Sequence, residues 1–81
     1  MPLTVNERVE RLRAVRQSLE KGEISSSNPQ GLAWLCEMMM EVIGGLVEEA
    51  PNLKVEVRMI RLYSEYENLR QVFEKLPRTQ A

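Results

Sequence analysis

The sequence contains no histidine and only one cysteine, Cys36, among its 81 residues. Histidine is the side chain most often used as a general base and as a metal ligand. A single cysteine cannot build a disulfide framework, and the chain does not start with a charged and then apolar leader. We therefore expect a cytoplasmic, non-enzymatic protein that has no catalytic residues, no metal and no cofactor.

Neither sign of charge is in excess, because 11 Lys and Arg residues face 12 acidic ones and the formal net charge is −1. Proteins that bind nucleic acid usually carry a basic excess that displaces counterions from phosphates, so this balance argues against nucleic acid as the main partner. A long enough apolar run is also missing. Residues 32–47 fall short of the roughly 20 that a bilayer requires and include Glu37 and Glu41, so we expect no membrane span.

What the sequence does contain is the pattern of an all-α protein. Thr4 and Glu7 have the spacing of a capping box, and the apolar residues that follow predict a helix over about 5–21 that ends at Gly22. Asn28 and Pro29 are suited to the start of a second helix, which we expect over about 29–49.

The third segment has the most regular apolar spacing, alternating between four and three residues. This pattern predicts a helix over about 53–76 with a coiled-coil-like seam. An alternative remains, because residues 53–59 also alternate as in a β-strand. The seam residues are Val55, Met59, Leu62, Tyr66, Leu69, Phe73 and Leu76.

The fold class is therefore a small three-helix bundle, or a helical hairpin plus a long third helix, forming one domain over residues 1–76. Residues 77–81 are expected to be a flexible tail. The second helix is apolar on most sides, so we expect it to be the middle layer between the other two. Gly44 and Gly45 each disfavour a helix interior by about 1 kcal/mol relative to alanine, which suggests that another helix crosses closely there.

Two neighbouring helices would still leave apolar surface uncovered, since consecutive methionines spread over about 200° of a helix. An exposed patch of this kind usually marks an interface, and a homodimer is the simplest way to cover it. A domain of 81 residues also buries a thin core alone. The residues expected at the interface are Trp34, Met38, Met39, Met40, Val55, Met59, Leu62 and Tyr66.

Two groups of charged residues allow other interpretations. The first helix carries four arginines that could dock an acidic partner or contact phosphates, although glutamates on the same helix favour a salt-bridged solvent face. The second helix carries three glutamates that could bind a divalent metal, although a solvated polar edge is the simpler interpretation. The two groups are Arg8, Arg11, Arg13 and Arg16, and Glu37, Glu41 and Glu48.

The leading hypothesis is a small regulatory protein that self-associates and acts through protein contacts, as an adaptor, an inhibitor or an assembly chaperone for a larger partner. The alternative is a small nucleic-acid-associated regulator that uses the arginines of the first helix. A metal-dependent enzyme built on the glutamates is the third possibility.

Overall fold

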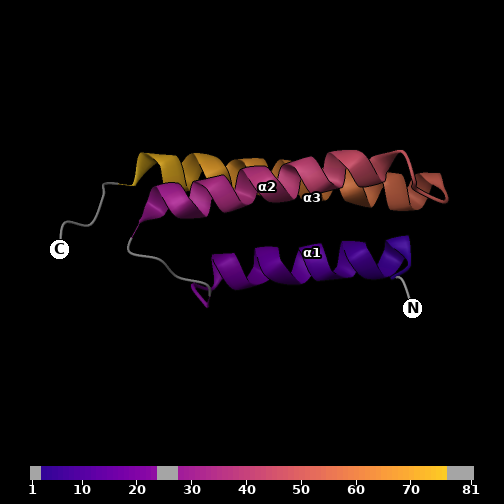
Figure 1. Cartoon of the computed structure of the whole chain (residues 1–81), viewed down its shortest axis with the longest axis horizontal. Helices are drawn as coiled ribbons and strands as arrows, with labels where there is room; N and C mark the ends of the chain where they lie inside the picture. The colour runs from indigo at the N-terminus through magenta and orange to yellow at the C-terminus, as the bar shows by residue number, and fades with distance from the viewer. Residues whose placement is uncertain (1–2, 24–27, 77–81) are drawn as a thin grey trace.

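The computed structural model describes residues 3–23 and 28–76. Three α-helices make up this part of the chain, and it contains no β-strand (Figure 1). The helices are α1 (Val5–Glu20), α2 (Pro29–Val47) and α3 (Leu53–Lys75). The predicted all-helical class is confirmed, and the strand interpretation of residues 53–59 is wrong because these residues form the first turns of α3. The predicted tail, residues 77–81, lies outside the described residues.

Each helix begins at a side chain that accepts a hydrogen bond from a free amide of the first turn. The hydroxyl of Thr4 accepts from the amide of Glu7 at 3.2 Å, as predicted. The Glu7 carboxylate accepts a bond from the same hydroxyl at 3.1 Å, whereas a complete capping box would engage the Thr4 amide. Asn28 and Asn52 cap α2 and α3 in the same way, with bonds of 3.1 and 3.0 Å.

The helix ends follow local backbone chemistry. After α1, Gly22 adopts a φ of 76°, the left-handed conformation that glycine tolerates best. α2 ends at Val47, two residues earlier than predicted. The amides of Glu49 and Ala50 instead bond to carbonyls three residues back, which tightens the chain before Pro51.

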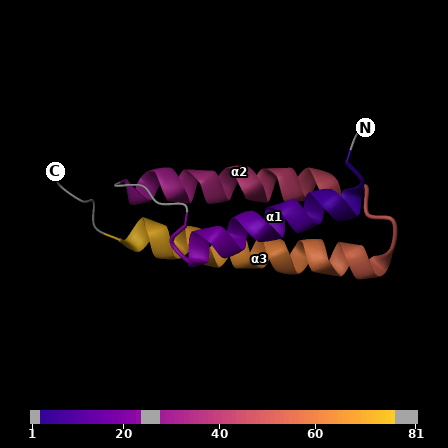
Figure 2. The ribbon, with the colours of Figure 1, turned by 90° about the horizontal axis from the view of Figure 1, so that it is seen from below.

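The fold is an elongated bundle with principal extents of 46 × 24 × 18 Å. α2 and α3 form a close antiparallel hairpin, and α1 lies along the groove between them (Figure 2). α1 packs more loosely than the hairpin helices pack on each other. α2 is therefore not a middle layer as predicted: it shares one face with α1 and α3, and neither of these two described helices lies against its opposite face.

The core is one continuous cluster that draws on all three helices. Tyr66 lies at its centre with 0% exposure, and its hydroxyl donates a hydrogen bond to the backbone carbonyl of Leu12. This bond joins α3 to α1, the more loosely packed helix. The core residues are Val9, Leu12, Leu19, Cys36, Met40, Ile43, Leu46, Val55, Met59, Leu62 and Tyr66.

The glycine pair of α2 does not mark a crossing with another described helix of the same chain. The helix continues through Gly44 and Gly45, but a Cβ atom built on either residue meets no other atom within 4 Å. Both residues are exposed. Within this chain, therefore, no described residue makes the predicted close approach, and the packing of the described residues does not require glycine at these positions.

Candidate functional site

The structure divides the predicted interface residues into two groups. One group is enclosed by the chain itself, with relative exposures of 9% or less: Met40, Val55, Met59, Leu62 and Tyr66. These five are core residues, so their assignment to an intermolecular surface is corrected. The spacing of the seam on α3 identified a buried face correctly, but spacing cannot tell whether the same chain or a second one covers it.

The other group lies on α2, and two of its three members are open to solvent. Trp34 is 61% exposed and Met38 38% exposed, while Met39 is half-buried against the core. Val42, at 44% exposure, belongs to the same surface although sequence reasoning missed it.

These side chains form one stripe along α2. At about 100° per residue, Trp34, Leu35, Met38, Val42 and Gly45 fall within an arc of roughly 100°. We call these five residues the outer stripe. Met38 lies about 160° around the helix from the buried Cys36, so the exposed part of the stripe is on the side of α2 away from the core, whereas Leu35 at its edge packs against the core. Four of its members are spaced by three and four residues from Leu35 to Gly45, and this spacing is the sequence signal that could have revealed a second helical seam.

An acidic edge runs beside the outer stripe. Glu37 is 3.6 Å from Arg70 of α3, whereas Glu41 and Glu48 form no ion pair with any described residue. Among the described residues, no group of three metal-ligating side chains is positioned to hold an ion. The three glutamates are therefore not arranged as a metal site in this part of the chain.

The apolar character of α2 is high enough to raise the question of a membrane. By length and composition alone, this 19-residue helix could cross one. The core helix of a soluble protein passes the same test, and here α2 contributes Cys36, Met40 and Ile43 to the core. Nine of its 19 residues are nevertheless exposed, and Trp34, Met38 and Val42 are among them.

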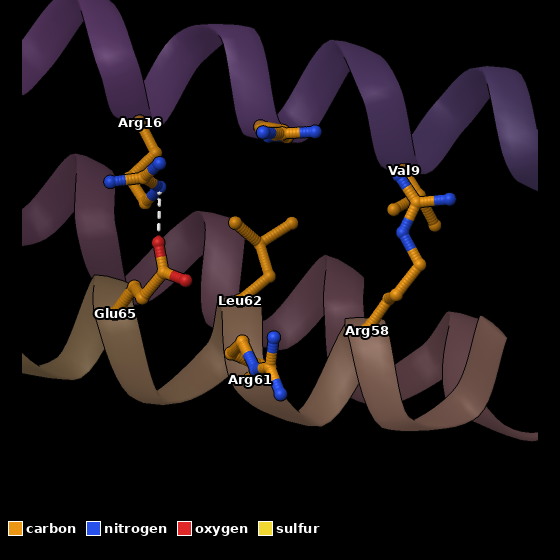
Figure 3. A pocket seen from close by; sticks show the side chains of 7 residues that line it. Val9, Arg16, Arg58, Arg61, Leu62 and Glu65 are labelled. Carbon is orange, nitrogen blue, oxygen red and sulfur yellow. Dashed lines mark ion pairs between the residues drawn. The ribbon is translucent and has the colours of Figure 1, made fainter. Parts of the chain in front are cut away.

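The four arginines of α1 do not act as one group. Arg13 and Arg16 line a groove between α1 and α3, together with Arg58 and Arg61 of α3 (Figure 3). Arg8 and Arg11 do not line it. Sequence reasoning missed the two arginines of α3, because only the packing of the helices brings them beside those of α1.

The remaining reactive side chains are enclosed. Burial raises the pKa of the Cys36 thiol to about 11, an effect that the positive charge of Arg70 partly offsets. Burial also raises the pKa of the Tyr66 hydroxyl, and the neighbouring Cys36 adds to this shift. Cys36 is 0% exposed, so its thiol is a packing group rather than a nucleophile.

Comparison with known proteins found no match: no family model, no curated protein and no solved structure matches this chain.

Proposed function

We propose that this protein is a non-enzymatic protein-interaction module, which self-associates through the outer stripe of α2 and in that form serves a larger protein partner. The observation that carries the proposal is the exposure of Trp34, Met38 and Val42 along one side of a helix whose other side already fills the core. Packing among the described helices does not need these side chains to be apolar, since neither α1 nor α3 covers them.

The composition of the stripe suits a protein contact. Tryptophan is among the residues that contribute most to binding energy at interfaces. Methionine adapts its flexible side chain to irregular surfaces. Gly45 leaves the helix backbone bare at the end of the stripe, which would allow a second helix to approach closely.

The occupant we favour is a second copy of the chain, packed against the first about a two-fold axis with the two α2 helices parallel. In a parallel helix pair, the residues on one flank of the seam face those on the opposite flank of the partner. One flank of the outer stripe carries Glu41 and Glu48, and the other lies toward α1. Arg11 lies about 160° around α1 from the groove residue Arg13, which puts it on the edge of α1 toward α2.

The charges complement each other in this arrangement. Glu41, Glu48, Arg8 and Arg11 form no ion pair with any described residue of their own chain. Parallel pairing brings the acidic flank of one copy toward the basic edge of the other. Antiparallel pairing would instead oppose the glutamates of the two copies, so the charges favour the parallel arrangement.

Sedimentation velocity over a range of micromolar concentrations tests the proposal. We expect wild-type protein to form a dimer and Val42→Glu to be monomeric but folded, because a buried carboxylate without a partner strongly disfavours the interface. Ile60→Glu is the matched control: Ile60 is 52% exposed on α3, outside the outer stripe, so this variant should remain dimeric.

Two results would contradict the proposal. One is a wild-type protein that stays monomeric throughout the concentration range. The other is equal loss of the dimer in Val42→Glu and Ile60→Glu, which would show that the outer stripe is not the contact. Flotation of the wild-type protein with lipid vesicles, in place of dimer formation, would assign the stripe to a membrane surface instead.

A further inference from the structure

The groove between α1 and α3 holds more positive charge than the chain itself neutralises. It contains a cavity of about 230 Å³. The residues that line it are Val9, Arg13, Arg16, Arg58, Arg61, Leu62 and Glu65. Four arginines and one glutamate therefore face the same small volume, although the net charge of the whole chain is −1.

Two of these arginines already have partners. Arg16 is 2.5 Å from Glu65 across the groove and 2.6 Å from Glu20 on its own helix. Arg58 is paired with Glu10 of α1 (Figure 3 shows the Arg16 and Arg58 side chains at the two ends of the cavity). The Arg16–Glu65 and Arg58–Glu10 pairs both join α1 to α3, one at each end of the cavity.

The other two have none. Neither Arg13 nor Arg61 forms an ion pair with a described residue, and both are exposed. One comes from each helix, and both line the same cavity. The groove therefore contains two guanidinium groups without a counter-charge among the described residues. One belongs to α1 and the other to α3.

The floor of the cavity is apolar. Val9 and Leu62 are 3% and 4% exposed and lie beneath the arginines. An apolar floor offers a bound anion no competing hydrogen bonds, and it limits the water that screens the guanidinium groups. Long arginine side chains also cover apolar surface with their methylene groups, and this packing role alone would explain Arg16 and Arg58. It does not explain why Arg13 and Arg61 lack a carboxylate partner.

We propose that this groove binds a small phosphate-class oxyanion, which bridges Arg13 of α1 and Arg61 of α3. The planar guanidinium group matches phosphate oxygens in bidentate geometry. A carboxylate would supply a single negative charge, whereas a phosphate group carries about −1.5 to −2 near neutral pH and has three acceptor oxygens. Two unpaired guanidinium groups therefore fit a phosphate better. The bound anion would also stabilise the position of α1 against α3, because α1 is the more loosely packed helix.

This inference does not depend on self-association, because the groove and the outer stripe use different residues. Isothermal titration of the full-length protein with inorganic pyrophosphate, at constant ionic strength, tests it. We expect one saturable site per chain. Arg13→Gln and Arg61→Gln should each weaken binding roughly tenfold or more, because each removes a charge-assisted contact. Circular dichroism checks that both variants remain folded.

Arg11→Gln is the matched control. It removes the same charge from the same helix, but Arg11 does not line the groove, so pyrophosphate binding should be unchanged. ATP and a short single-stranded oligonucleotide complete the set of probes. Tighter binding of ATP than of pyrophosphate, with the same dependence on Arg13 and Arg61, would support the site and assign it to a nucleotide.

Three outcomes would overturn the inference. The first is the absence of pyrophosphate binding at millimolar concentration. The second is equal weakening by Arg11→Gln and Arg13→Gln, which would indicate general charge attraction. The third is oligonucleotide binding without pyrophosphate binding, which would favour a nucleic-acid surface. Sedimentation of the same variants separates this question from the dimer, since Arg13→Gln and Arg61→Gln should sediment like the wild type.

Discussion

The glycine pair of α2 provides a quantitative prediction about the open face of the molecule. In a helix interior, glycine is about 0.8–1.0 kcal/mol less favourable than alanine. A Cβ atom at Gly44 or Gly45 meets nothing within 4 Å, so no steric term opposes that gain. Each alanine substitution should therefore raise the free energy of unfolding of a single chain by about 1 kcal/mol, and the double substitution by about 2 kcal/mol, because helix propensities sum along a helix and neither added methyl group meets a neighbour.

The measurement is thermal unfolding followed by circular dichroism. It should be made in the Val42→Glu background, so that folding is observed apart from association. For a domain of this size, about 1 kcal/mol corresponds to a rise in Tm of roughly 4–8 °C. A fall in Tm for either alanine variant would refute the reasoning, since it would mean that a side chain at that position meets another part of the chain.

The two glycines then differ in association. Gly45 belongs to the outer stripe, whereas Gly44 lies about 100° away, toward Tyr63 on α3. In the otherwise wild-type chain, Gly45→Leu should fold but form a much weaker dimer, because a large side chain separates the paired helices. Gly44→Leu is the matched control and should leave the dimer intact. Unimpaired association of Gly45→Leu would remove this glycine from the proposed contact.

Three further predictions concern the core. Tyr66→Phe should lower the free energy of unfolding by about 0.5–1.5 kcal/mol in a denaturant titration, because it removes the hydrogen bond to the Leu12 carbonyl but leaves the ring in place; no change would mean that the bond does not stabilise the fold. Leu62→Ala should cost about 2–5 kcal/mol and Ile60→Ala far less, since Leu62 is 4% exposed and Ile60 is 52% exposed; equal effects would contradict the packing of α3. The pKa of Cys36 is raised from 9.0 to about 11, so between these pH values the unfolded chain releases a proton that the folded chain keeps. Stability should therefore fall as pH rises, by on the order of 1.4 kcal/mol per pH unit, and Cys36→Ala should remove this part of the slope while leaving the contribution of Tyr66.

The helices were the part of the fold that the sequence determined most directly. Local chemistry decides where a helix begins, so Thr4 and Asn28 marked two of the starts, and Asn52, the third cap, is of the same residue type. The end of α2 was less predictable. Pro51 disfavours helix at the residue before it, Ala50, but the chain leaves the helix two residues before Ala50, at Glu48, through a tightened turn that no single residue specifies.

The arrangement of the helices could not be read from periodicity in the same way. The apolar seam on α3 required a partner, but its spacing fits α2 of the same chain as well as a second copy. Gly44 and Gly45 were misleading for a related reason. A glycine pair in a helix suggests a close approach, yet no described residue of this chain makes one.

The charged groove depended on packing even more strongly. Arg13 and Arg61 are separated by 47 intervening residues in the sequence and by glutamates that balance the overall charge. Only the position of α1 over the hairpin places the two side chains around one cavity. The net charge of −1 averages over the whole chain and so conceals a local excess of positive charge.

The fluorescence of Trp34 tests the central claim most directly, because it is the only tryptophan in the chain and it lies in the outer stripe. As protein concentration rises from the nanomolar to the high micromolar range, its emission should shift to shorter wavelength and its quenching by acrylamide should decrease, while Val42→Glu keeps the solvent-exposed signal throughout. A wild-type Trp34 that remains equally accessible to the quencher at every concentration would contradict self-association through this face of α2.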